Sequence, residues 1–357
     1  MSPQPNGTLA PTAWLVRSGK SGERDAFNLE NGVATGGFRE VPDLTDVASR
    51  EQLWERVRAA YPDDPDGTIS NFAGQLWALR SRIQPGDTVV LPLKTSSQIA
   101  IGVATGGYRF VAEAEPERRH VIDVDWQRID VPRTAVHQDL LYSLGAFMTV
   151  CQIKRNDGAW RLRKILATGS DPGARPETVK DEAVDEAIVA GSSGTAGTVV
   201  DLERAARDRI QSFVASRFAG HRLSNLVAAV LEAEGFFTQV APPGPDGGID
   251  VFAGRGPLGL DSPGLIVQVK SSPTPVDSRV VRELHGVLST HGAEQALLVA
   301  WGGVNKVARQ ELRSQFFRVR VWDSDDLLNA VMRNYDRLAE ELRADLPLKR
   351  IWTLVEE

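Results

Sequence analysis

The sequence predicts two globular domains, an α+β domain followed by an α/β domain, and three observations support this. The chain has 357 residues, which is enough for two separate hydrophobic cores. Residues 167–200 are poor in aromatic side chains and rich in Gly, Ser, Pro and acidic residues, which is typical of a linker. Strand patterns dominate before this segment, whereas strands and helices alternate after it. We therefore expect a first domain at 1–166, an acidic Gly/Ser-rich linker at 167–200 and a second domain at 201–357.

The first domain is expected to contain a small curved sheet flanked by helices. The pattern predicts strands at 13–18, 88–93, 99–110 and 126–136, and helices at 49–61 and 68–83. Ser49 is a typical N-cap, and Leu53 and Val57 follow it at helical spacing. The turn Pro85-Gly86-Asp87 ends the second helix and leads into the next strand.

The second domain is expected to have a mixed, largely parallel central sheet flanked by helices. The pattern predicts helices at 201–218 and 221–234, strands at 237–241, 248–253 and 264–270, a helix at 278–290, a strand at 295–300, a helix at 304–316, a strand at 318–322 and a last helix from about 325. Strands that alternate with helices imply βαβ crossovers, and these cover both faces of a sheet.

Composition and charge exclude several classes of protein. One cysteine, Cys151, excludes an internal disulfide and a cysteine-based zinc cage. No apolar run approaches the roughly 20 residues that span a bilayer, and the N-terminus does not resemble a signal peptide. We therefore expect a cytoplasmic protein without a membrane partner. The net charge is −6, but residues 167–200 hold six acidic and two basic residues, so the charge does not exclude DNA binding.

A carboxylate, an amide and a lysine are expected to meet in the second domain. Asp250 lies in an otherwise apolar strand, where an acid is costly unless it is paired or bound to a metal. Gln268 and Lys270 end a later strand and point to the same face. If the two strands form a hairpin, these side chains can bind Mg²⁺ and orient a water for phosphodiester hydrolysis. The alternative is structural: Asp250 caps a turn and Lys270 is a solvated strand end.

The same stretch resembles a known nuclease family. The segment RLSNLVAAVLEAEGFFTQVAPPGPDGGIDVFA and the strand IVQVK are similar to the Mrr-type catalytic domain of the PD-(D/E)XK nuclease superfamily, over residues from about 222 to 330. The resemblance implies a restriction-endonuclease-like fold with Mg²⁺, or Mn²⁺ in its place, as the cofactor. It also implies that Asp250, Gln268 and the backbone carbonyl of Val269 bind the metal and that Lys270 is catalytic.

Two further positions follow from this resemblance. Asp246 matches an acid that is often present just before the metal-binding strand, in a supporting role. Many relatives carry Glu on the first helix, whereas this chain has Ser224 in that place. The missing carboxylate leaves open a descendant that binds DNA without cleaving it.

The first domain is similar, over shorter motifs, to PUA-like domains such as the EVE and SRA-type readers of modified bases. The motifs are QPGDTVVLP and IAIGVATGGYRF. The resemblance implies that this domain binds DNA, including modified bases. Its candidate contacts are two Gly-Gly-aromatic-Arg motifs and a basic run, namely Phe38, Arg39, Tyr108, Arg109, Lys154, Arg155, Arg161, Arg163 and Lys164. The alternatives are that the aromatic residues are core and that the run is a solvated strand pair.

Three functions compete at this stage. The leading one is a Mg²⁺-dependent DNA endonuclease of a restriction system, modification-dependent and type IV-like. The second is a structure-specific nuclease of DNA repair or recombination that uses the same site. The third is a DNA-binding protein with a degenerate nuclease fold, which the replacement at Ser224 suggests. One site cuts one strand, so double-strand cleavage predicts a homodimer or a higher oligomer on DNA.

Overall fold

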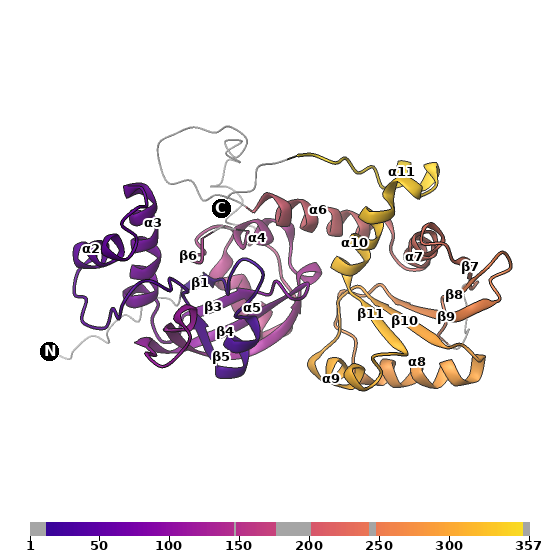
Figure 1. Ribbon diagram of the computed structural model, residues 1–357, viewed down its shortest axis with the longest axis horizontal. Coiled ribbons are helices and arrows are strands. Elements are labelled where there is room, and N and C mark those ends of the chain that lie inside the picture. The colour runs from indigo at the N-terminus through magenta and orange to yellow at the C-terminus, as the bar shows by residue number, and fades with distance from the viewer. Residues whose placement is uncertain (1–11, 146–147, 176–200, 243–247, 353–357) are drawn as a thin grey trace. The chain divides into compact units, whose positions relative to one another are not determined.

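The computed structural model describes residues 12–145, 148–175, 201–242 and 248–352. The chain divides into two compact units, Met1–Asp208 and Arg209–Glu357 (Figure 1). The division falls inside α6 (Leu202–Arg217). Most of the expected linker, residues 176–200, lies outside the described residues. No helix in the described ranges combines the length and the apolar character needed to cross a bilayer.

The N-terminal unit is built on a six-stranded sheet with the order β2-β5-β4-β3-β1-β6. The strands are β1 (Ala13–Val16), β2 (Val33–Thr35), β3 (Thr88–Pro92), β4 (Gln98–Phe110), β5 (His120–Pro132) and β6 (Val150–Gln152). Only β1 and β3 pair in parallel; the other described pairs are antiparallel. This is the predicted α+β arrangement, with the long β4–β5 hairpin at its centre.

The described α-helices of this unit include the two predicted at 49–61 and 68–83 and three that the sequence pattern did not predict. They are α1 (Asp25–Asn31), α2 (Arg50–Ala60), α3 (Asp66–Trp77), α4 (Gln138–Ser143) and α5 (Gly158–Thr168). Ser49 caps α2 as predicted, because its side chain accepts a hydrogen bond from the Gln52 N–H. One alternative is wrong: the basic run at 154–166 is not a strand pair, because its residues from Gly158 onward belong to helix α5. Leu162 and Ile165 are buried at helical spacing and fix this choice.

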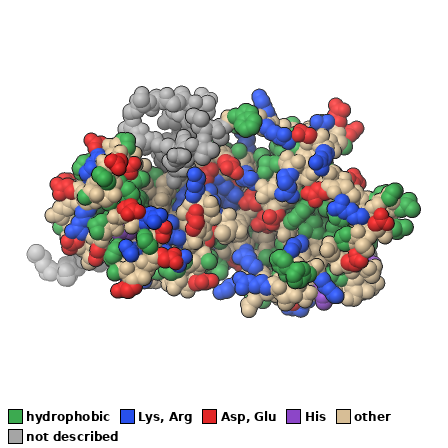
Figure 2. All heavy atoms as spheres, in the orientation of Figure 1, with side chains coloured by type: hydrophobic (Ala, Val, Ile, Leu, Met, Phe, Trp, Pro, Cys, Tyr) green, Lys and Arg blue, Asp and Glu red, His purple; other side chains and the backbone are tan. Residues whose placement is uncertain are grey.

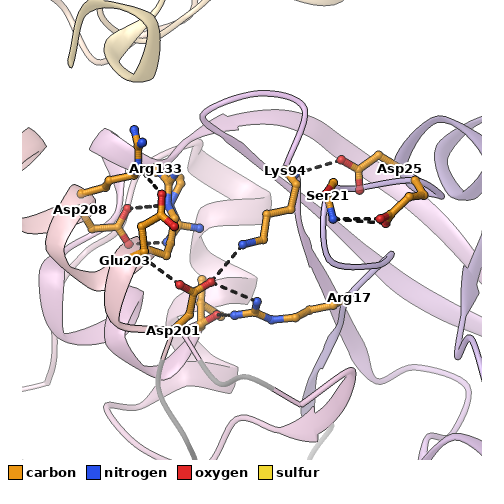
Figure 3. Close-up of polar contacts among 12 residues, drawn as sticks. Arg17, Ser21, Asp25, Lys94, Arg133, Asp201, Glu203 and Asp208 are labelled. Carbon is orange, nitrogen blue, oxygen red and sulfur yellow. Dashed lines mark hydrogen bonds and ion pairs between the residues drawn. The ribbon is translucent and has the colours of Figure 1, made fainter. Parts of the chain in front are cut away.

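The start of α6 is held on the N-terminal unit by ion pairs (Figure 3). Asp201 accepts from the Lys94 ammonium at 3.0 Å and lies 3.5 Å from the Arg17 guanidinium. About two helical turns further along, Asp208 forms a bidentate pair with Arg133, and both side chains are almost completely buried. Because removing one partner of a buried pair leaves an uncompensated charge, this contact strongly favours the observed position of the helix start.

The C-terminal unit has a five-stranded mixed sheet with the order β11-β10-β9-β8-β7. The strands are β7 (Phe237–Val240), β8 (Val251–Arg255), β9 (Asp261–Lys270), β10 (Gln295–Ala300) and β11 (Val319–Trp322). The pairs between β9, β10 and β11 are parallel, whereas β7, β8 and β9 form antiparallel pairs. The mixed sheet with flanking helices agrees with the predicted class.

Helices cover both faces of this sheet, and a hydrophobic core lies beneath each layer (Figure 1). The helices are α7 (His221–Ala233), α8 (Ser278–His291), α9 (Lys306–Ser314), α10 (Ser324–Asn334) and α11 (Glu340–Asp345). One core joins α7 and α10 to one face through residues such as Leu226, Val267 and Leu327. The other joins α8 and α9 to the opposite face through residues such as Ile266 and Leu284. Alternate side chains of β9 therefore pack into different cores.

Charged side chains of both signs cover the described surface. On the face shown in Figure 2, basic and acidic groups are interspersed rather than gathered by sign. This agrees with the near balance of charged residues outside residues 167–200. A DNA contact must therefore be sought in the local arrangement of particular side chains, not in the net charge.

Candidate active site

Asp250 is fixed where strands β8 and β9 separate. The predicted hairpin is present, with Val251 opposite Val267. β8 begins at Val251, so Asp250 precedes the strand instead of lying within it as predicted. The Asp250 N–H still bonds to the Val267 carbonyl at 2.8 Å, and the Asp250 carboxylate accepts from the Val269 N–H at 2.8 Å. The carboxylate thus takes a ladder position that a main-chain carbonyl normally fills.

Helix α7 contributes Ser224 to the same place. Ser224 is 1% exposed, and its hydroxyl lies 3.4 Å from Asp250 Oδ1. Leu223, Leu226 and Val227 on the same helix pack into the core and hold this side of α7 against the sheet. The residue that replaces the expected first-helix acid therefore faces the Asp250 carboxylate.

Gln268 presents a buried oxygen without a partner. The residue is 6% exposed, and no described residue donates a hydrogen bond to its Oε1 atom. An unsatisfied buried acceptor is costly, so a group outside the described residues, such as a water molecule or a ligand, is expected at this oxygen. Gly248 supports this amide: its φ is +88°, and a Cβ atom there would lie 2.7 Å from Gln268 Nε2. Both the backbone angle and the lack of space require glycine at this position.

Lys270 and Gln268 open into a pocket of about 480 Å³ between β9 and α8. The pocket is lined by Gly248, Gln268, Lys270, Glu283, Leu284, Gly286, Val287 and Thr290. The Lys270 carbonyl accepts from the Trp301 N–H at 2.9 Å, which fixes the end of β9 beside β10. Sequence reasoning missed the contribution of α8. The spacing of Glu283, Gly286, Val287 and Thr290 along one side of a helix is the signal that could have found it.

The oxygen atoms of this site fit a hard divalent cation. Asp250 supplies a carboxylate and Gln268 supplies the unsatisfied amide oxygen. The Val269 N–H points to Asp250, and the N–H and carbonyl of one strand residue point to the same side, so the Val269 carbonyl also faces this side of the strand. The described residues contain no group of three or more His, Cys, Asp or Glu side chains that could hold a metal ion. The donor set is therefore one carboxylate with neutral oxygens; Asp246 lies outside the described residues.

The aromatic candidates of the N-terminal unit make well-defined internal contacts. The Tyr108 hydroxyl accepts from the Leu44 N–H at 3.3 Å and lies 2.9 Å from His120 Nδ1. Burial raises the pKa of Tyr108 and lowers the pKa of His120, which favours a neutral imidazole whose Nδ1 accepts a hydrogen bond from the Tyr108 hydroxyl and whose Nε2–H donates to the Val41 carbonyl. Phe38 packs edge-on against Phe72, with ring centroids 5.4 Å apart. These contacts favour the core alternative for both rings.

The basic candidates of this unit divide into paired and exposed side chains. Arg109 pairs with Asp123 at 2.8 Å, and Arg39 pairs with Glu40 at 3.2 Å. The exposed cations of the basic run are Lys154, Arg155, Arg163 and Lys164. The structure corrects the expectation that Arg161 contacts DNA. Its side chain is fully buried between the carboxylates of Asp139 and Asp171, because α5 turns this position towards the interior.

Two family models match this chain. Residues 215–331 match a family described as restriction endonuclease, Mrr_cat. Residues 14–150 match a domain of unknown function, DUF8426. The first match confirms the expected Mrr-type restriction endonuclease domain, and its bounds include Ser224, Asp250, Gln268 and Lys270. No curated protein matches the chain.

Solved structures with similarity to the chain include two restriction enzymes. The MspJI restriction endonuclease in complex with a 27-mer oligonucleotide is 14% identical, with 93% of this chain and 79% of that chain covered and a TM-score of 0.32. The DNA modification-dependent restriction endonuclease AspBHI is 13% identical, with 88% and 78% covered and a TM-score of 0.32. A protein of unknown function, AF1548, is 19% identical, with 35% and 77% covered and a TM-score of 0.25.

Proposed function

We propose that the C-terminal unit is a Mg²⁺-dependent DNA endonuclease that hydrolyses phosphodiester bonds. The observation that carries this proposal is the unsatisfied Gln268 oxygen, which lines one pocket with Lys270, on a strand whose Val269 N–H, between these two residues, anchors the Asp250 carboxylate. A segment that matches a restriction endonuclease family contains all of these residues. A carboxylate that can hold a cation and a lysine that can meet a phosphate suit a substrate whose phosphate is negatively charged and must be polarised.

Each residue has a separate part in this reaction. Asp250, Gln268 and the Val269 carbonyl hold the cation, with Mn²⁺ as an alternative to Mg²⁺. When bound, the cation polarises the scissile phosphate and lowers the pKa of a water molecule. Lys270 orients the attacking water and stabilises the negative charge that develops on the phosphate oxygens. Gly248 keeps the Gln268 amide in position.

We further propose that the N-terminal unit selects DNA and that selection depends on base modification, as in type IV-like restriction. Two features support a recognition role. Gly37 and Phe38 are consecutive residues with positive φ (+72° and +54°), and non-glycine residues in this region concentrate at functional sites. The cations Lys154, Arg155, Arg163 and Lys164 are exposed and suit phosphate contacts. Because one site cuts one strand, the working form on duplex DNA is a homodimer or a higher oligomer.

A second candidate function is DNA binding without cleavage, and Ser224 favours it. With a hydroxyl in place of the first-helix carboxylate, the site has fewer charged ligands for a metal. A repair nuclease would use the same cleavage residues without dependence on modification. Cleavage itself, and its dependence on modification, therefore separate the three functions.

The test is Mg²⁺-dependent cleavage of plasmids from methylating and non-methylating hosts, with Lys270→Ala beside the native chain. We expect cleavage of the modified plasmid only, reduced about 10²–10⁴-fold in Lys270→Ala, the range for loss of a group that handles a proton. Lys306→Ala is the matched control, because Lys306 is exposed on α9 and does not line the pocket.

Each result has a distinct meaning. Equal cleavage of both plasmids retains the nuclease and rejects dependence on those modifications. Retained DNA binding without any cleavage supports the non-cleaving alternative. Equal loss of activity in Lys270→Ala and Lys306→Ala would reject the role given to Lys270.

A further inference from the structure

The proposed metal site is short of negative charge among the described residues. Asp250 is its one described carboxylate, and Ser224 brings a hydroxyl from α7. Mg²⁺ is usually held by one or two carboxylates together with waters and substrate phosphate. A dication, a single carboxylate and the nearby Lys270 ammonium sum to a charge of about +2, and a second carboxylate would lower this to about +1 before a phosphate binds. The pocket identifies where one could come from.

Glu283 is the one carboxylate among the described residues that line the pocket with Gln268 and Lys270. It lies on α8, whose start is fixed because the Asp277 side chain accepts from the Arg279 N–H at 2.9 Å. Leu284 is buried in the core beneath this helix. Because Leu284 packs against the sheet, its neighbour Glu283 lines the pocket. A glutamate side chain at that position can extend towards the end of β9.

The present partner of Glu283 holds it only weakly. Glu283 accepts from Arg279 Nε at 2.7 Å, within one turn of α8, and the two side chains are 51% and 79% exposed. Exposed ion pairs of this kind contribute little to stability. Here the arginine precedes the glutamate, which is the less favourable order along a helix. The Glu283 carboxylate can therefore exchange this partner for a dication at small cost.

We propose that Glu283 contributes the second carboxylate of the divalent-cation site, from α8 rather than from α7. This inference rests on the proposed function, since it concerns the same metal. It explains how a chain with Ser224 at the first-helix position retains enough negative charge for a cation. It also makes α8 part of the active site and not only a covering layer.

The test is a titration of the full chain with Mn²⁺ in the absence of DNA. Electron paramagnetic resonance measures the concentration of free Mn²⁺ and so gives the affinity. We expect Glu283→Gln to weaken Mn²⁺ binding roughly tenfold or more, the range for residues that support a metal site. Glu311→Gln is the matched control. Glu311 also accepts from an arginine of α8, Arg282 at 2.8 Å, but it does not line the pocket. We expect its Mn²⁺ affinity to equal that of the native chain.

Two further variants separate the possible failures. Arg279→Gln breaks the ion pair and keeps the carboxylate, so its Mn²⁺ affinity should be unchanged or higher. A loss in Arg279→Gln equal to that in Glu283→Gln would overturn the inference, because the ion pair would then be what matters. If Asp250→Asn weakens Mn²⁺ binding and Glu283→Gln does not, the inference is wrong and the proposed metal site stands. If Asp250→Asn also leaves binding unchanged, the proposed site itself is wrong.

Discussion

The Ser224 hydroxyl lies 3.4 Å from the Asp250 carboxylate, so α7 presents a neutral group to the acid that precedes β8. The same carboxylate is held from the other side by the Val269 N–H. The contacts position Asp250 without adding charge. The ligand strength of the site therefore depends on neighbouring oxygens, which makes several residues testable one at a time.

Ser224→Asp should make the stability of the chain depend on a divalent cation. Two carboxylates at this distance in a buried position repel each other and raise the pKa of one of them. We expect the free energy of unfolding to fall by about 1–3 kcal/mol without metal, the cost of burying an unsatisfied polar group. Millimolar Mg²⁺ should restore much of it. Thermal denaturation with and without Mg²⁺ measures this effect.

The control for this variant is Ser216→Asp, because Ser216 is exposed on α6. Its melting temperature should respond to Mg²⁺ as that of the native chain does. If Mg²⁺ shifts the melting temperature of Ser224→Asp no more than that of Ser216→Asp, a metal site beside Asp250 is contradicted.

Gln268→Met should stabilise the protein and impair its function. Methionine has a similar shape and removes the buried oxygen that lacks a partner. We expect the free energy of unfolding to rise by about 1 kcal/mol or more. The native chain loses the hydration of the Gln268 oxygen on folding without gaining a hydrogen bond, and methionine has no such oxygen. Mg²⁺-dependent cleavage should fall at the same time. Urea denaturation and plasmid cleavage measure the two effects, and a less stable Gln268→Met chain would show that the oxygen has a partner in the folded protein.

Gly286 should tolerate a methyl group but not a large side chain. A Cβ atom at Gly286 meets no atom within 4 Å, although the residue lies in the middle of α8. Gly286→Ala should therefore raise the free energy of unfolding by about 0.5–1 kcal/mol, because glycine is a poor helix former. Gly286→Leu should fill the pocket and reduce cleavage. Equal cleavage by the Ala and Leu variants would exclude this part of the pocket from substrate binding.

Cys151 should report on the integrity of the N-terminal unit. Burial raises the pKa of this thiol to about 11 from its ordinary 9.0. Only the thiolate reacts with iodoacetamide, so at pH 8 the folded chain should react roughly a hundredfold more slowly than the chain in urea. The rate for the folded chain should rise as the pH approaches 11. Equal rates for the folded and the urea-treated chain would show that β6 does not protect the thiol.

The sequence was sufficient for the parts of the site that depend on local geometry. Alternation along a strand predicts that Gln268 and Lys270 share a face, and both line one pocket. The predicted hairpin is present, and it places the Asp250 carboxylate on the Val269 N–H. Helix and strand boundaries followed from caps such as Ser49 and from the spacing of apolar residues. These features involve neighbours in sequence or one pairing of strands, so a pattern of residue types is enough to predict them.

The parts that depend on packing between distant elements could not be predicted in this way. The spacing of Glu283, Gly286, Val287 and Thr290 marks one side of α8, but it does not show that this side faces Gln268 and Lys270, because that depends on how α8 packs on the sheet. Arg161 is buried because two distant acids, Asp139 and Asp171, meet it inside the unit. In the basic run, only Leu162 and Ile165 mark the buried side of the helix, and the many charged residues around them are also compatible with a solvated strand pair.

The position of Asp250 in the β8–β9 ladder also limits how this chain can change during evolution. Its carboxylate replaces a main-chain acceptor for the Val269 N–H, so most substitutions would break a strand contact as well as remove the proposed metal ligand. Asparagine keeps the acceptor and loses only the charge. A homologue that has given up catalysis should therefore more often carry asparagine here than a random residue. At Lys270, whose side chain is half-buried at the pocket, many residues would be tolerated once catalysis is lost.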